Sequence, residues 1–241
     1  MSKVVLIHGN GETTGRDQWF PYVQNSLNDA GVECIAPDMP DPVLARARYW
    51  LPYLEELGCD SSTVLVGHSS GAVAAMRYAE SHEVEGLVLV GTYYTDLGYD
   101  DEKASGYFEN AWDWPAIKAH HQWSAIFAST DDPYIPIDEP RYIRDELGAE
   151  ISPRCLPRHQ TCWQFSSPFS QRSYGRYATS YSPIVNRPLS APGWRGRELL
   201  RPLAVSEDGF VDAITRPVLG DSGQHSGLLG ATQSHPAAEC G

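Results

Sequence analysis

The chain has 241 residues, of which 41% are hydrophobic, and its formal net charge is −13. The acidic balance disfavours nucleic acid and anionic membranes as partners, and no run of about eighteen apolar residues predicts a membrane-spanning helix. The five cysteines are an odd number without a C-x-x-C pair, which supports neither a disulfide framework nor a zinc site.

Strand-like and helix-like segments alternate through the first 150 residues. Continuous apolar runs predict strands at 3–7, 32–36, 63–66, 87–90 and 124–128. Helical patterns lie between them at about 19–30, 43–57, 72–80 and 140–147, and we expect Pro52 to break or bend the second helix. The apolar run at residues 3–7 is too short for the hydrophobic region of a secretory signal, and this favours a cytoplasmic protein. The alternation predicts an α/β fold with a doubly wound, mainly parallel sheet.

Two stretches depart from this rhythm. The segment 93–114 is long for a connection and rich in Tyr, Trp, Asp and Gly, which is typical of a lid over a site.

Beyond residue 150 the apolar period is lost, and the net charge changes from −16 over residues 1–150 to +3 over the remainder. We therefore expect a core over residues 1–150, with an outer limit near residue 165, and an irregular or disordered Ser/Pro/Arg-rich tail over residues 151–241. An alternative exon or a frameshift is our hypothesis for its origin.

The pentapeptide Gly67-His68-Ser69-Ser70-Gly71 fits the G-x-S-x-G pattern. A predicted strand leads in and a predicted helix leads out, which is the setting of a nucleophile elbow. Ser69 is therefore the candidate nucleophile, whereas Ser70 has glycine at only one flank. The backbone N–H of Ser70, at the start of the helix, is a candidate oxyanion donor, and the N–H of Asn10 in the glycine-rich loop after the first strand is the second.

A serine hydroxyl needs a general base, usually a histidine that a carboxylate orients. Asp132 follows the predicted strand 124–128 and is preferred to Asp131 as that carboxylate. His159, 27 residues further on, has the right spacing for the base, although prolines and arginines precede it. His225 and the absence of any working base remain the alternatives.

Several blocks of the first 150 residues resemble the retinoblastoma-binding protein 9 family of small serine hydrolases. The shared stretches are Gly9-Asn10-Gly11, Met39-Pro40-Asp41-Pro42, Trp50-Leu51-Pro52, Gly67 through Glu80, Ala104-Ser105-Gly106-Tyr107-Phe108 and Ser129-Thr130-Asp131-Asp132-Pro133. The resemblance implies an α/β-hydrolase fold and a Ser-Asp-His triad without metal or cofactor. It also implies small ester, amide or short peptide substrates and allows aminopeptidase-like cleavage.

The chain departs from that family at two places. The family's histidine lies in a Gly-His-Phe motif, whereas Arg158 and Gln160 flank His159 here. A catalytically impaired enzyme or a protein-interaction module on the same fold is therefore the alternative function. The Leu-x-Cys-x-Glu motif for retinoblastoma-type pockets is also incomplete, because Ser61 stands where its glutamate would be, so such binding is not predicted.

Overall fold

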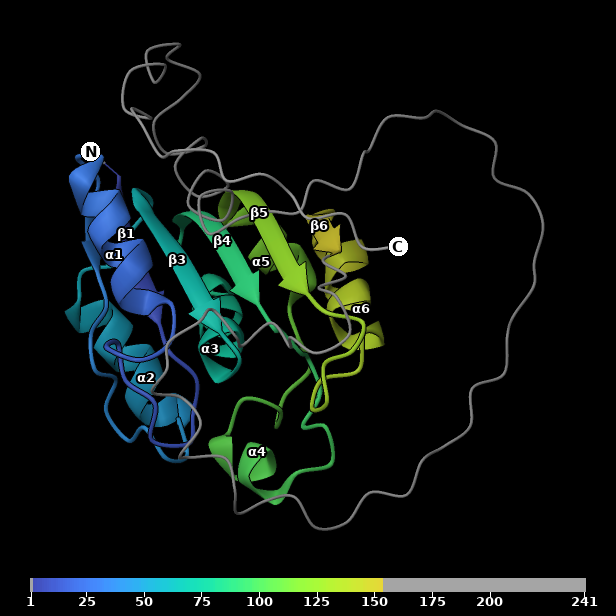
Figure 1. Ribbon diagram of the computed structural model, residues 1–241. Coiled ribbons are helices and arrows are strands. Elements are labelled where there is room, and N and C mark those ends of the chain that lie inside the picture. The colour runs from blue at the N-terminus through green and yellow to red at the C-terminus, as the bar shows by residue number, and fades with distance from the viewer. Residues whose placement is uncertain (1, 154–241) are drawn as a thin grey trace, which may run out of the picture.

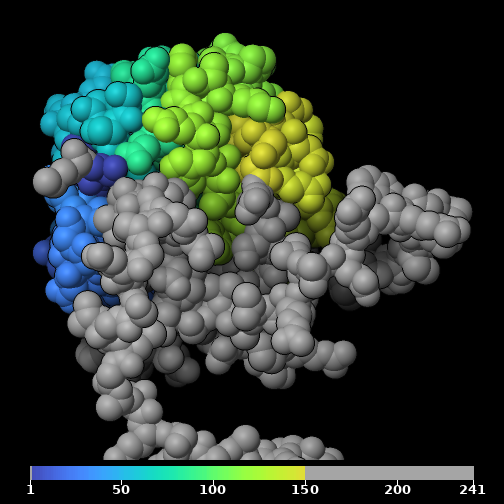
Figure 2. All heavy atoms as spheres, turned by 90° about the horizontal axis from the view of Figure 1, so that it is seen from above, coloured from blue at the N-terminus to red at the C-terminus, as the bar shows by residue number. Residues whose placement is uncertain are grey.

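A computed structural model describes residues 2–153, which form one parallel sheet of six strands with helices on both faces (Figure 1). The strand order is β2-β1-β3-β4-β5-β6. The strands are β1 (Lys3–Ile7), β2 (Glu33–Ile35), β3 (Thr63–His68), β4 (Val84–Val90), β5 (His121–Ala128) and β6 (Glu150–Pro153). Figure 2 shows the N-terminal elements (blue) and the last described elements (yellow) at opposite sides of the described part of the chain, as this order requires. The α/β architecture expected from the sequence is confirmed.

The helices divide unequally between the two faces of the sheet. They are α1 (Phe20–Asp29), α2 (Ala47–Glu56), α3 (Ser70–Ala79), α4 (Asp100–Ser105), α5 (Trp114–Ala119) and α6 (Asp138–Leu147). Residues of α2, α3, α5 and α6 pack with one face of the sheet, and α1 packs with the other. Within residues 2–153, no helix has the length and apolarity needed to cross a bilayer.

Burial on both faces explains the continuous apolar strands. In β1, Val5 and Ile7 belong to the cluster with α2 and α3, whereas Val4 and Leu6 belong to the cluster with α1. Successive side chains of a strand point to opposite faces, so a strand between two helical layers needs apolar residues at every position.

The order in which successive strands are added to the sheet reverses at β1. Strand β2 pairs with one edge of β1 and β3 with the other. In open parallel sheets, ligands bind outside the carboxyl ends of the strands at such a switch point. The loops that leave β1 and β3 therefore meet where a binding site is expected, and α4 lies beyond the same end of the sheet (Figure 1).

Two details differ from the sequence-based expectations. Helix α2 is continuous through Pro52, so the expected break is absent; Trp50 and Leu54 bury the same face on both sides of the proline. The short helices α4 and α5 were not predicted, because six residues are too few to show a helical period. Strand β6 runs three residues past residue 150 and stays within the outer limit near residue 165. The rest of the tail lies outside the described residues, so this division into core and tail stays a prediction.

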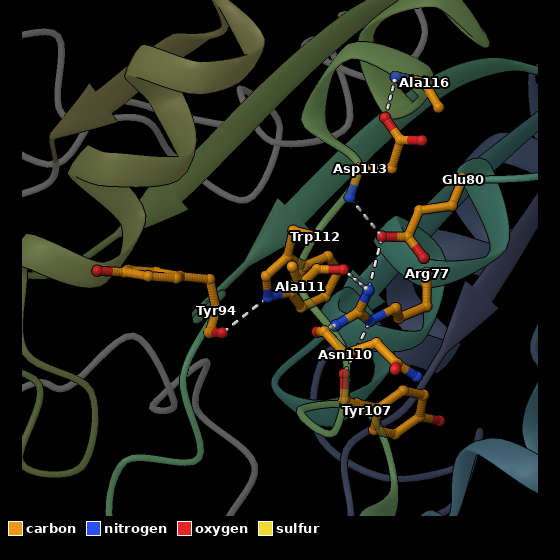
Figure 3. Close-up of polar contacts among 9 residues, drawn as sticks. All are labelled: Arg77, Glu80, Tyr94, Tyr107, Asn110, Ala111, Trp112, Asp113 and Ala116. Atoms are coloured by element: carbon orange, nitrogen blue, oxygen red, sulfur yellow. Dashed lines mark hydrogen bonds and ion pairs between the residues drawn. The ribbon is translucent and has the colours of Figure 1, made fainter.

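Arg77 on α3 holds the long segment that follows β4 (Figure 3). Its guanidinium is buried, pairs with Glu80 at 2.6 Å and lies 3.6 Å from the centre of the Trp112 ring. It also donates hydrogen bonds to three backbone carbonyls, those of Tyr107 (2.8 Å), Asn110 (2.8 Å) and Ala111 (3.2 Å). Only a planar fork with several donors can satisfy all of these acceptors at once.

We expect Arg77→Lys to lower the free energy of unfolding by about 2–4 kcal/mol. A lysine has one ammonium group, which cannot reach all of these acceptors at once. An acceptor left without a donor in a buried place, such as the Tyr107 carbonyl, costs about 1–3 kcal/mol. Denaturant unfolding measures the change. Arg141→Lys is the matched control, because Arg141 is exposed and makes one ion pair with Asp138; its effect should stay below about 0.5 kcal/mol. Equal effects of the two substitutions would contradict this role of Arg77.

Candidate active site

Ser69 forms a sharp turn between β3 and α3. Its backbone angles are φ 55° and ψ −122°, a region that non-glycine residues seldom adopt and that costs of order 1–3 kcal/mol. The Ser69 N–H donates to the Val90 carbonyl of β4 at 2.9 Å, and the Ser69 carbonyl accepts from Ala72 N–H at 2.9 Å. The turn is therefore held from the sheet on one side and from the helix on the other.

The glycines on either side of this turn are required by close backbone contacts. A Cβ atom on Gly67 would lie 2.3 Å from the Gly71 carbonyl oxygen, and one on Gly71 would lie 2.2 Å from the Ile7 carbonyl oxygen. Cβ atoms do not approach backbone oxygens so closely, so both positions must be glycine. Helix α3 can then begin directly against the ends of β1 and β3.

The loop after β1 runs beside Ser69. A Cβ atom on Gly9 would lie 3.2 Å from Cβ of Ser69. Thr13 Oγ1 donates to the Gly9 carbonyl and, at 3.1 Å, to the Asn10 carbonyl. The backbone N–H groups of Asn10 and Ser70 have no acceptor among the described residues. The two predicted oxyanion donors therefore belong to the two segments that meet at Ser69.

The rival serine is already engaged by a tyrosine. Ser70 is 1% exposed, and its hydroxyl lies 3.1 Å from the hydroxyl of Tyr93. Ser69 is half-buried by contrast. This difference in access favours Ser69 as the reactive residue.

Asp132 follows β5 at the same edge of the sheet, with the end of β4 between it and Ser69. Its Oδ1 accepts from the backbone N–H groups of Tyr134 (2.9 Å) and Ile135 (3.0 Å). Its Oδ2 accepts no hydrogen bond from the described residues. Asp131 instead accepts from the Ser129 hydroxyl. The carboxylate of Asp132 is thus oriented through one oxygen by two backbone N–H groups.

Among the described residues, His8 and His68 flank the segments that meet at this turn, and both rings have other neighbours. His8 donates from Nδ1 to the Gly9 carbonyl at 2.7 Å and accepts at Nε2 from Met39 N–H at 2.9 Å, which fixes a neutral ring. The ring of His68 packs edge-on against Trp19 and Phe20, and burial, with a smaller effect of His8, lowers its pKa to about 3. The predicted base His159 and its alternative His225 lie outside the described residues.

Sequence reasoning missed two buried groups beside Ser69. Tyr93 lies three residues beyond the end of β4, and its hydroxyl lies 3.1 Å from that of Ser70. Burial raises the pKa of Tyr93, and the charge of Glu102 adds to this shift. Glu102 lies on α4, is 7% exposed, and accepts from Asn10 Nδ2 at 2.9 Å. A glutamate between Asp101 and Lys103 has the pattern of an exposed helix, so no signal in the sequence distinguished it.

Comparison with known proteins identifies a family and several relatives. The model of the "Alpha/beta hydrolase family" matches residues 4–222. "Serine hydrolase RBBP9" of Rattus norvegicus is 46% identical over 153 residues, which are 62% of this chain and 82% of that protein. "Putative hydrolase YdeN" of Bacillus subtilis (strain 168) is 27% identical over 62% of this chain and 80% of its own length. The crystal structure of the B. subtilis ydeN gene product superposes with a TM-score of 0.59 at 24% identity, over 65% of this chain and 86% of that one, and shows the shared fold.

We expect Gly71→Ala to lower the free energy of unfolding by roughly 3 kcal/mol or more, because the new methyl group collides with the backbone of β1. Gly98→Ala is the control. Gly98 has φ +80° with open space around it, so alanine there meets backbone strain alone, at about 1 kcal/mol. Urea unfolding compares the two variants, and a loss at Gly71 no larger than at Gly98 would contradict the close approach.

We expect stability to fall as the pH drops below about 6.5, partly because of His68. Its pKa is lowered to about 3 in the folded chain from 6.5, so the unfolded chain takes up the proton first. The contribution of neutral His68 to the free energy of unfolding is complete above pH 6.5. It falls at lower pH by up to about 1.4 kcal/mol per pH unit.

Unfolding free energies of the parent and of His68→Gln between roughly pH 7 and pH 5 test this expectation. Carboxyl groups contribute equally to both proteins, so the difference in slope isolates His68. The variant should show the shallower slope, and parallel curves would refute the assignment.

Proposed function

The chain belongs to the alpha/beta hydrolase family, and on that premise we propose that it is a serine hydrolase in which Ser69 is the nucleophile. The observation that carries the proposal is the strained turn of Ser69 between two obligatory glycines. A non-glycine residue in such a conformation indicates a functional constraint. The turn presents a hydroxyl at the switch point of the sheet, and the G-x-S-x-G elbow of this fold has the same features.

In the proposed reaction, Ser69 Oγ attacks the carbonyl carbon of the substrate while His159 accepts the hydroxyl proton. The negative charge that develops on the carbonyl oxygen is stabilised by the N–H groups of Ser70 and Asn10. The imidazolium then protonates the leaving alcohol or amine, and an acyl-enzyme remains. Water, deprotonated by the same imidazole, releases the acid and restores the serine. Asp132 holds the ring and stabilises its charged form.

Small ester or amide substrates are the proposed substrate class, and aminopeptidase-like cleavage is included. The similarity to a protein named as a serine hydrolase supports the reaction type. The free thiols of Cys34 and Cys59 suit a cytoplasmic compartment, which we also propose.

A second candidate is an inactive member of the fold that acts by binding. The specific observation in its favour is the sequence around His159, where Arg158 and Gln160 replace the glycine and phenylalanine expected from the resemblance. If this histidine does not approach Ser69, the hydroxyl lacks a base, and the oxyanion donors alone supply little turnover.

Reaction with a fluorophosphonate probe tests the proposal. We expect labelling of the full chain that Ser69→Ala abolishes, because phosphonylation requires an activated serine. His159→Ala should slow labelling by about 10³-fold or more, as expected for removal of a general base from a triad. Mass spectrometry locates the modified residue.

Two substitutions serve as controls. Ser61→Ala changes an exposed serine outside the site and should leave the labelling rate unchanged, and His225→Ala should do the same. Folded protein that resists the probe would favour the binding module. Labelling that survives His159→Ala but not His225→Ala would move the base to His225.

A further inference from the structure

The loop between β2 and α2, residues 36–46, closes on itself through Asp41. The Asp41 carbonyl accepts from the Ala45 N–H at 2.8 Å. The Asp41 carboxylate accepts from the Arg46 guanidinium at 2.7 Å (Nε) and 2.8 Å (Nη2), and from the Arg46 backbone N–H at 3.2 Å. These hydrogen bonds close a turn over residues 41–46, which we call the Asp41 turn.

The backbone of the Asp41 turn is strained. Asp41 has φ 52° and Ala45 has φ 49°, both in the left-handed region, where a non-glycine residue costs free energy. Ala45 is fully buried, and the side chains of Asp41 and Arg46 are 18% and 28% exposed. The hydrogen bonds from Arg46 lower the pKa of Asp41, so the carboxylate stays charged at neutral pH. Backbone strain that tertiary contacts maintain is a feature of functional sites.

The Asp41 turn contacts the loop that carries Asn10, on the side that follows this residue. The Gly11 N–H donates to the Val43 carbonyl at 3.3 Å, and the Glu12 N–H donates to the Pro42 carbonyl at 3.4 Å. Both acceptors belong to the turn. Hydrogen bonds of this length weaken steeply with further separation, so a small shift of the turn would release both amides.

A second contact lies just before Asn10. The Met39 N–H donates to Nε2 of the buried His8 at 2.9 Å, and Nδ1 of His8 donates to the Gly9 carbonyl at 2.7 Å. The Gly9 carbonyl and the Asn10 N–H belong to one planar peptide group. Fixing the direction of this carbonyl therefore fixes the direction in which the Asn10 N–H points.

Residues 39–46 thus hold Asn10 from both sides along the chain. An oxyanion donor is effective only when it is already placed about 3 Å from the position that the charged oxygen will occupy. Asn10 lies between Gly9 and Gly11, and glycines leave the backbone free to adopt many conformations. The position of this N–H therefore depends on the neighbouring loop.

We propose that Asp41 is a positioning residue for hydrolysis: by closing its turn, it holds the Asn10 N–H at the oxyanion beside Ser69. This proposal rests on the hydrolase function and on the oxyanion role of Asn10 given above. It adds a residue that acts on the reaction through a neighbouring loop.

The competing explanation is that Asp41 only stabilises the fold. A purely structural residue changes the number of folded molecules but not the kinetics of each. Displacement of an oxyanion donor instead slows acylation and deacylation together, because a tetrahedral oxyanion forms in both steps. In that case kcat falls while KM stays the same, as expected for an interaction made only in the transition state.

Hydrolysis of p-nitrophenyl acetate by the full chain and by Asp41→Ala separates the two explanations. Fluorophosphonate labelling carried to completion counts the competent molecules, so that kcat refers to these alone. Complete loss of one oxyanion donor lowers kcat by roughly 10²- to 10³-fold. We expect Asp41→Ala to lower kcat by about 10-fold or more, with KM within about 2-fold of the parent value.

Asp60→Ala is the matched control. Asp60 also closes a turn, since it accepts from the Ser62 N–H at 2.9 Å and from the Ser62 hydroxyl at 2.7 Å. This turn precedes β3, whereas Ser69 follows the same strand at its other end. The substitution removes the same charge and a similar set of hydrogen bonds, so kcat per competent molecule should equal that of the parent.

Two further variants test the contacts of the Asp41 side chain. Asparagine tolerates the left-handed region and still accepts from Arg46, so Asp41→Asn should keep kcat within about 3-fold of the parent. Asp41→Gly removes the carboxylate without backbone strain, should lower kcat as alanine does, and serves if the alanine protein does not fold. A kcat that Asp41→Ala and Asp41→Gly leave unchanged, or an equal loss in Asp41→Asn, overturns the proposal.

Amide hydrogen exchange separates failure of this proposal from failure of the hydrolase function. Asp41→Ala or Asp41→Gly should speed exchange of the Gly11 and Glu12 N–H groups at least about 10-fold, whereas Asp60→Ala should not. If the parent hydrolyses no ester and resists the probe while exchange responds in this way, the hydrolase function fails and the hold of Asp41 on the loop stands. Exchange that the Asp41 variants leave unchanged overturns the proposal, whatever the activity.

Discussion

The approach of helix α3 to the carboxyl ends of β1 and β3 is possible only because Gly67 and Gly71 lack side chains. Ser69, between them, is forced to a positive φ, and the cost of this conformation must be met elsewhere. All ten residues of α3 are buried, and the Ser69 N–H is tied to β4. The packing of a whole helix thus holds one strained residue in place, which is the preorganisation that a reactive hydroxyl needs.

The distribution of charge around this turn limits what the site can accept. Glu102 is buried near Ser69, and Asp132 lies at the same edge of the sheet. Arg77, the buried cation of α3, is directed at backbone carbonyls of the segment that follows β4. The carboxylates near the turn among residues 2–153 therefore make this part of the site acidic.

Local patterns were sufficient for the sheet and for part of the site. A strand buried on both faces has to be apolar at every position, so β1 and β3 were visible as runs. The G-x-S-x-G pattern between a strand and a helix identified Ser69, because the glycines reflect contacts within a few residues of it. Sequence patterns did not predict α4 and α5, because these helices are too short to show a period. The break predicted at Pro52 is absent, because burial of α2 outweighs one missing hydrogen bond.

The sequence by itself determined the alternation of strands and helices, the candidate serine and the acid after β5, because each depends on residues adjacent in the chain. Only the tertiary structure brought Asn10, Tyr93 and Glu102 to one place, from three separate segments at one edge of the sheet. The physical reason is that burial and electrostatic environment depend on neighbours far away in sequence. A glutamate in an acidic stretch of sequence was therefore recognised as a buried, unsatisfied carboxylate only once the chain was folded.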